Sequence, residues 1–229
     1  MRASTHIEVT RPSLQRVLLA APLALVASTY VVFQIALRLF GDVSGYIVGF
    51  AFYWIAWGLA VPLFTVGREG IVAMFDRGRS QFGMPAVLAV PLLAAPAVYG
   101  FLFIFPGLFP SAGDRLVFAA AVYALMNGVL EEVFWRGLFV RAFPRDAMRG
   151  VAYPAAAFAA WQLVPFSLFP IWFPGGPIAL VALSLMLGFL YGWIAWRTGS
   201  IRWTALAHVL MNFSGVGAFL IYAPNSGLP

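Results

Sequence analysis

The sequence contains no cysteine and no lysine, and it has few charged residues of either sign. The absence of cysteine excludes disulfide bonds, thiolate metal sites and a cysteine nucleophile. Charged residues make up only 10% of the 229 residues, whereas hydrophobic residues make up 62%. Soluble domains carry about 25% charged and about 45–50% apolar residues. This composition therefore excludes an ordinary water-soluble domain, a disordered chain and a coiled coil.

Long apolar runs take the place of the missing charge. A membrane-spanning helix needs about 20 apolar residues, and the chain has room for about seven such helices. A membrane β-barrel is disfavoured, because its strands alternate polar and apolar residues in segments of about ten. We expect an all-α fold, a polytopic transmembrane helical bundle that forms a single domain over residues 1–229. The expected spans lie near residues 17–37, 46–66, 84–106, 116–140, 151–166, 177–196 and 203–222.

All fourteen basic residues are arginine, and they give the chain a net charge of +6. They gather in the N-terminal segment and in alternate connections between the expected spans, while the opposite connections hold only Arg38 and Arg115. Cytoplasmic connections are enriched in basic residues, so this alternation predicts a cytoplasmic N-terminus and a C-terminus outside. The positive charge is thereby explained by membrane topology, and no nucleic-acid partner is expected.

Two adjacent acids stand inside the fourth expected span. Ionisable residues within a membrane are costly and mark functional sites by default. Glu132 and Arg136 are four residues apart and can pair on one helix face. Glu131 points elsewhere and has no such partner in the sequence, and an unpaired buried carboxylate suits a general base. The alternative is a polar cluster that only holds the helices together.

Three further polar residues lie in the later spans. His208 and Asn212 are one turn apart on one face of the seventh expected span, and Gln162 lies in the fifth. At a rise of 1.5 Å per residue, each of them and Glu131 lies roughly 8–15 Å from the cytoplasmic end of its helix. We therefore expect Glu131, Gln162, His208 and Asn212 to meet at one level inside the membrane.

These residues resemble the motifs of the CPBP family of intramembrane proteases, which includes the type II CAAX prenyl endopeptidases and the abortive-infection-like membrane proteins. The motif EExxxR corresponds to residues 131–136, and the motif HxxxN to residues 208–212. The motif FxxxH begins at Phe158 but ends in Gln162 instead of histidine. The resemblance covers residues 116–215, the expected catalytic core.

The resemblance implies a role for each matched residue. Glu131 would be the general base, His208 would orient water or donate a proton, and Asn212 would stabilise the oxyanion. Glu132, Arg136 and Phe158 would support the site. Gln162 can orient a water molecule by hydrogen bonds, but it cannot take a proton and is a poor metal ligand. We expect no cofactor. A catalytic zinc usually has three protein ligands, and only one histidine lies in the expected spans, so metal-independent activation of water is favoured. A divalent metal is the open alternative.

The leading hypothesis is an intramembrane endopeptidase of the glutamate type in a bacterial or archaeal cell membrane. It would cleave a peptide bond of a membrane-associated or lipidated protein near the cytoplasmic face, and membrane lipid would surround it. The second hypothesis, raised by Gln162, is a weakened or inactive protein of the same fold that acts in binding, immunity or scaffolding. A third, a small transporter, is weaker because the sequence shows no inverted repeat and no pair of broken helices.

Overall fold

The computed structural model describes residues 12–78, 82, 84–108, 110, 113–169, 173 and 175–216. Within these residues every regular element is a helix, and no strand is present. Several helices contain π-helical stretches, which are labelled η. The elements are α1 (Pro12–Phe52), η1 (Tyr53–Ala60), α2 (Val61–Ala73), α3 (Ala86–Tyr99), η2 (Gly100–Ile104), α4 (Phe105–Leu108), α5 (Gly113–Glu131), η4 (Glu132–Leu138), α6 (Phe139–Ala142), η5 (Met148–Ala152), α7 (Tyr153–Trp161), α8 (Leu163–Leu168), α9 (Gly176–Thr198), α10 (Arg202–Met211) and η6 (Asn212–Val216).

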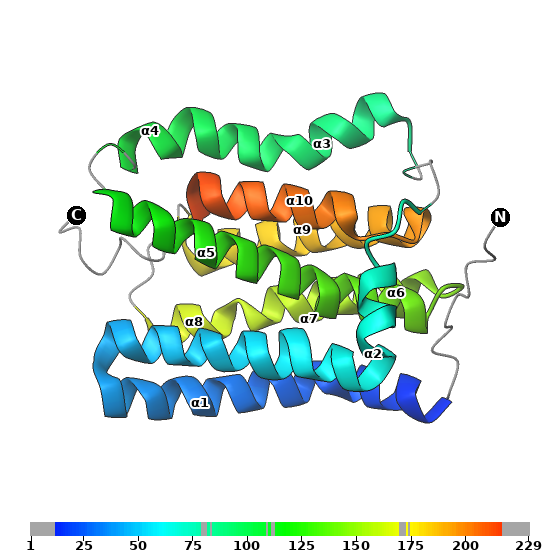
Figure 1. Cartoon of the computed structure of the whole chain (residues 1–229), viewed down its shortest axis with the longest axis horizontal. Coiled ribbons are helices and arrows are strands. Elements are labelled where there is room, and N and C mark those ends of the chain that lie inside the picture. Colours follow the sequence, from blue (N-terminus) through cyan, green and yellow to red (C-terminus); the bar gives the residue numbers. More distant parts are fainter. Residues whose placement is uncertain are drawn as a thin grey trace.

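The first helix folds back on itself. Gly41 has a φ of 75° and a ψ of −178°, a backbone conformation that is open to glycine and strained for other residues. The chain reverses there, so that the two arms of α1 lie side by side (Figure 1). Phe33 of the first arm packs edge-on against Phe50 of the second, with ring centroids 5.4 Å apart. The N-terminal part of the chain is therefore a helical hairpin.

Among the described residues, five helical stretches are long and apolar enough to cross a membrane, and the protein is an integral membrane protein. They are Pro12–Ala73, Ala86–Gly107, Gly113–Ala142, Met148–Leu168 and Gly176–Thr198. The first of them contains the reversal at Gly41, and the helical segment formed by α10 and η6 is shorter than the others. The expected bundle of membrane helices is confirmed, whereas the number of about seven spans stays a prediction.

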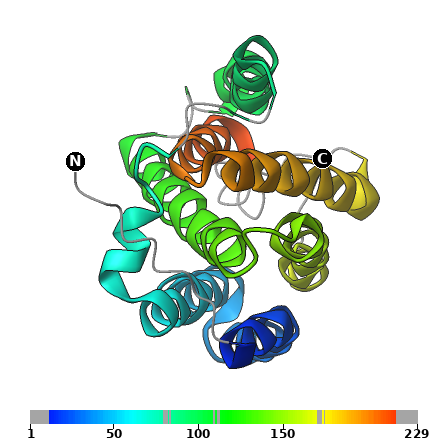
Figure 2. The same ribbon diagram turned by 90° about the vertical axis from the view of Figure 1, so that its right-hand side faces the viewer.

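The helices of the matched polar motifs lie together in the middle of the bundle. Figures 1 and 2 show α5, α7, α9 and α10 between the α1 hairpin and α3, which lies at the opposite edge beside α10. Small residues let α9 approach α7 closely, because a Cβ at Gly188 would lie 3.2 Å from the Cα of Ala155. Close approach at small residues is a common way for membrane helices to associate.

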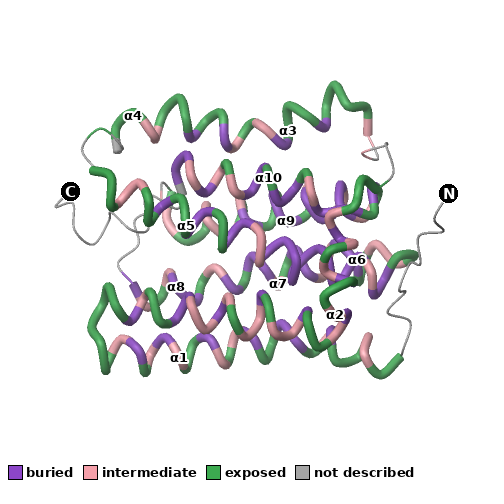
Figure 3. The backbone as a smooth tube through the Cα atoms, in the orientation of Figure 1, coloured by how far each residue is buried: buried purple, intermediate pink, exposed green. Residues whose placement is uncertain are grey.

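The outer surface of the bundle is apolar, as a lipid environment requires. Phe64 is 91% exposed, Ile178 is 82% exposed and Leu23 is 75% exposed. Figure 3 shows exposed residues along α3 and the α1 hairpin, and buried residues where α6 and α7 meet. The polar residues of the first and third sequence motifs are buried in the same interior, whereas Gln162 is half-buried. The arrangement therefore places apolar side chains outward and buries three charged side chains, Glu131, Glu132 and Arg136, in the interior.

Segments far apart in the sequence meet at one end of the bundle. The side-chain amide of Gln15 donates to the carbonyl of Ala142 at 2.7 Å, and the N–H of Ile201 donates to the carbonyl of Met74 at 2.9 Å. The last residues of α2, after a bend at Gly67, cross this end (Figure 1). The start of the chain and the connections after α2, α6 and α9 therefore lie at this end of the bundle, at the right in Figure 1.

Candidate active site

The two adjacent glutamates lie where α5 passes into the π-helical stretch η4. Glu131 is 1% exposed and Glu132 is completely buried. A charge buried to this degree is stable only when other polar groups surround it. The two side chains therefore require partners from neighbouring helices, and each has its own set.

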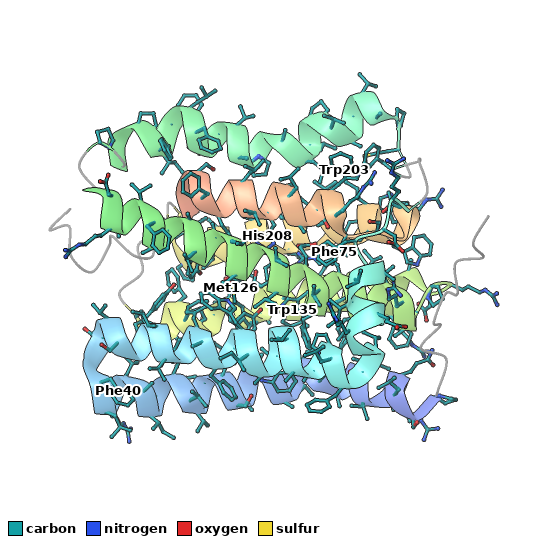
Figure 4. The ribbon with its side chains drawn as sticks, viewed as in Figure 1. Phe40, Phe75, Met126, Trp135, Trp203 and His208 are labelled. Carbon is teal, nitrogen blue, oxygen red and sulfur yellow. The ribbon has the colours of Figure 1, made fainter. Side chains whose placement is uncertain are left out.

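His208 of α10 lies between the two carboxylates. Its Nδ1 is 3.0 Å from Oε1 of Glu132, and its Nε2 is 3.5 Å from Oε2 of Glu131. Figure 4 shows the labelled His208 in the middle of the bundle, away from both ends. An imidazole whose Nδ1 donates to Glu132 presents its second nitrogen to Glu131. The histidine can therefore pass a proton to or from the side of Glu131.

Glu132 also pairs with Arg136 one turn further on the same helix. The Nη1 atom of Arg136 is 3.1 Å from Oε1 of Glu132, and the arginine side chain is 3% exposed. The guanidinium group lies over the ring of Phe158, 4.5 Å from its centroid, and this ring is edge-on to His208 at 6.4 Å. Phe158 thus joins α7 to the glutamate–histidine cluster, as a supporting residue would.

Asn212 is buried one turn after His208, at the start of the π-helical stretch η6. Its backbone N–H bonds the carbonyl of His208, which keeps the two residues in one helix. Its side-chain Nδ2 has no hydrogen-bond partner among the described residues. A buried amide donor without a partner is able to bind an oxygen atom of another molecule.

Gln162 lies at the turn between α7 and α8 and is half-buried. Its backbone bonds Phe158 and Phe166, but within the described part of the chain its side chain makes no hydrogen bond to Glu131 or His208. Helix α7 ends at Trp161, and the backbone N–H of Gln162 closes the last turn of the helix by donating to the carbonyl of Phe158. The structure joins Glu131, Glu132, Arg136, Phe158 and His208 by direct contacts, and the role expected for Gln162 stays a prediction.

Aromatic residues complete the surroundings of Glu131, and the sequence motifs do not indicate them. The hydroxyl of Tyr53 donates to Oε1 of Glu131 at 3.1 Å, and the indole N–H of Trp135 donates to Tyr53 Oη at 2.8 Å. Tyr53 also stacks on Trp161, with centroids 4.1 Å apart and an interplanar angle of 18°. Glu131 therefore has partners that its sequence position did not predict.

Asn127, one turn before Glu131, also accepts a hydrogen bond from a residue of η1. The indole N–H of Trp54 donates to its side-chain oxygen at 3.0 Å. Tyr53 and Trp54 are neighbours in an otherwise apolar segment, and only their polar atoms distinguish them from ordinary membrane aromatics. A search for aromatic residues with a polar atom at the depth of Glu131 could have found them.

Among the residues that the structure describes, no group of three or more histidine, aspartate or glutamate side chains is arranged to hold a metal ion. The cluster instead contains two carboxylates, one imidazole, one guanidinium and one amide. A carboxylate can take a proton from water, an imidazole can move it, and an amide can stabilise a negative oxygen. The chemistry that these groups support is hydrolysis.

Comparison with known proteins points to the same half of the molecule. Residues 113–214 match the family model described as "Type II CAAX prenyl endopeptidase Rce1-like". No curated protein and no solved structure matched the chain. The matched residues include both glutamates, His208 and Asn212, but neither Tyr53 nor Trp54.

Proposed function

We propose, from the match of residues 113–214 to the Rce1-like type II CAAX prenyl endopeptidase model, that the protein is an intramembrane endopeptidase of the glutamate type. Its substrate is a membrane-associated or lipidated protein, cut at a peptide bond near the cytoplasmic face. The catalytic core comprises residues 116–215 within a single transmembrane domain. The observation that carries the proposal is His208, which lies between two buried glutamates.

Glu131 acts as the general base. It takes a proton from a water molecule, and the oxygen of that water attacks the scissile carbonyl carbon. Asn212 donates its unpartnered N–H to the oxyanion that forms. His208, 3.5 Å from Oε2 of Glu131, moves the proton to the leaving amine as the carbon–nitrogen bond breaks. Gln162 helps to orient the water, and no metal takes part.

Glu132 and Arg136 keep His208 in place. The Nδ1 atom of His208 is held at 3.0 Å from Oε1 of Glu132, which is itself paired with Arg136 at 3.1 Å. With Nδ1 bound, the ring is oriented so that Nε2 is directed at Glu131. Phe158 packs against both the guanidinium group and the imidazole and limits their movement.

Cleavage of peptides by the purified protein in detergent tests the proposal. A mixed library of lipidated and unlipidated peptides is incubated with the wild type, with Glu131→Gln and with Glu69→Gln, an exposed glutamate that serves as the matched control. Loss of a general base lowers the rate by about 100-fold or more. We expect that loss in Glu131→Gln alone. Equal cleavage by Glu131→Gln and the wild type would reject Glu131 as the base.

Two further arms address the metal and Gln162. Cleavage is expected to survive a chelator, and a complete loss that zinc restores would overturn the metal-independent mechanism.

The second candidate function is an inactive protein of the same fold that binds a partner. It is favoured by the Gln162 side chain, which has no hydrogen bond to Glu131 or His208. No cleavage by the wild type together with cleavage by Gln162→His would show that Gln162 removes the activity and would favour that second function.

A further inference from the structure

Tyr53 contacts the proposed general base from outside the matched segment. It begins the π-helical stretch η1, is 2% exposed and lies 78 positions before Glu131 in the chain. Stretches of π-helix are rare and occur frequently at functional sites. Among the described hydrogen bonds, the one from Tyr53 Oη at 3.1 Å is the only one that reaches a carboxylate oxygen of Glu131.

The direction of this hydrogen bond follows from the partner on the other side of Tyr53. Trp135 Nε1 is 2.8 Å from Tyr53 Oη, and an indole nitrogen can only donate. The phenol oxygen therefore accepts from Trp135 and has its single proton left for Glu131. Because Trp135 donates to the phenol oxygen, the hydroxyl of Tyr53 donates its own proton to the carboxylate of Glu131.

The bond from Tyr53 makes the two oxygens of Glu131 different. Oε1 is held by Tyr53, whereas Oε2 makes no hydrogen bond within the described residues and lies 3.5 Å from Nε2 of His208. The oxygen that can take a proton from water is therefore Oε2. The stack of Tyr53 on Trp161, at 4.1 Å, keeps the phenol in place and so keeps the carboxylate from rotating.

We infer that Tyr53 is a positioning residue that orients the carboxylate of Glu131, with Trp135 fixing the direction of its proton. The inference rests on the proposed function, in which Glu131 is the general base. It adds a residue from the N-terminal hairpin to the machinery of the matched domain. The hairpin thereby takes part in catalysis in addition to covering the core.

The substitution Tyr53→Phe removes the hydroxyl and keeps the ring that stacks on Trp161. We expect a fall in kcat of roughly 10-fold, the effect of one lost hydrogen bond to a charged group, with KM within about 2-fold. Tyr46→Phe is the matched control. Its ring belongs to the same aromatic group, 4.6 Å from Phe50, but its hydroxyl makes no hydrogen bond to Glu131. We expect the kcat of Tyr46→Phe to equal that of the wild type.

A spectroscopic arm tests the inference without any need for activity. The chain has only four glutamates, Glu8, Glu69, Glu131 and Glu132, so ¹³C-labelled glutamate gives a simple carboxyl region in the infrared spectrum. The band that disappears in Glu131→Gln belongs to Glu131. That band is expected to shift in Tyr53→Phe and to stay in place in Tyr46→Phe, because only the first substitution removes its donor.

The two arms separate the inference from the proposed function. A wild type that cleaves nothing contradicts the proposed function, while the infrared band still decides whether Tyr53 orients Glu131. Wild-type kcat together with an unshifted band in folded Tyr53→Phe overturns the inference. If Tyr53→Phe fails to fold, Trp135→Phe takes its place, since it removes the donor that directs the phenol. An unshifted band and an unchanged kcat in that variant likewise overturn the inference.

Discussion

Glu131 and Glu132 are neighbours in the sequence but differ in their partners. Glu132 is held by Arg136 at 3.1 Å and by His208 at 3.0 Å, so its charge is compensated. Glu131 has a neutral phenol at 3.1 Å and the second nitrogen of His208 at 3.5 Å. One glutamate is therefore suited to hold the cluster together, and the other is suited to exchange protons.

The ion pair of Arg136 and Glu132 gives the first prediction at this scale. Arg136→Met leaves Glu132 buried without its cation, and we expect a loss of about 3–5 kcal/mol in the free energy of unfolding. The control is Arg149→Met, which breaks a solvent-exposed pair with Asp146 at 3.5 Å. An exposed pair contributes less than about 1 kcal/mol. Denaturant unfolding in mixed micelles measures both values.

A second substitution separates loss of charge compensation from loss of packing. Glu132→Gln combined with Arg136→Met removes the stranded charge, and we expect it to be more stable than Arg136→Met alone. If Arg136→Met is no less stable than Arg149→Met, or the double variant regains nothing, the buried pair does not hold the cluster.

At the scale of the helices, the spacing of α5 and α10 brings His208 to the glutamates. A Cβ placed on Gly128 would lie 2.8 Å from the backbone nitrogen of Val209, the residue after His208. Real Cβ atoms are essentially never this close to backbone atoms. Gly128 therefore allows the approach that forms the site, one turn before Glu132.

Gly128→Ala is expected to force α10 away from α5. Overpacking of this kind costs about 1–3 kcal/mol, and the displaced His208 lowers peptide cleavage as well. Gly107→Ala is the control, because nothing lies within 4 Å of a Cβ at that helical position. Thermal unfolding in detergent and the peptide assay report the two effects. Equal stability and activity of the two alanine variants would show that the close approach is not needed.

The π-helical stretches explain why residues beyond the motifs were hard to find. Tyr53, Glu132 and Asn212 each begin such a stretch, in which the backbone bonds run from residue i to i+5 and the helical faces drift from those of a regular α-helix. Helical periodicity correctly predicted the pair of Glu132 and Arg136. The same periodicity is unable to show which face of η1 turns toward Glu131.

At the scale of the whole molecule, the arginine-rich connections gather at one end. A hydrogen bond from Gln15 to Ala142 joins the start of the chain to the connection after α6, and one from Ile201 to Met74 joins the connections after α9 and α2. These are the connections in which the sequence concentrates arginine. One end of the bundle is thus basic, and we propose that this end faces the cytoplasm.

The lack of cysteine makes this orientation simple to test. Asp42→Cys and Asp146→Cys each introduce a single thiol, one at the reversal of α1 and one in the arginine-rich connection before η5. A membrane-impermeant maleimide added to intact cells is expected to label Asp42→Cys only. Both variants should react after the membrane is opened with detergent. Labelling of Asp146→Cys alone in intact cells would reverse the proposed topology.

The sequence by itself determined the class of the protein and the identity of the motif residues. Composition requires a helical membrane protein, because only helices satisfy their backbone hydrogen bonds over long apolar runs. The cost of burying charge marked Glu131, Glu132 and Arg136, and their spacing indicated one pair. These conclusions depend on local features of the chain, so no tertiary structure was needed.

Only the tertiary structure showed the aromatic residues that hold Glu131, directly or through a neighbouring ring. Tyr53 and Trp161 come from other helices, and Gly128 sets a distance between helices that no motif encodes. Helical periodicity gives the face on which a residue lies but not the rotation and separation of two packed helices. Those depend on the shapes of all the side chains between them. The partners of a buried carboxylate are therefore a property of the packed bundle.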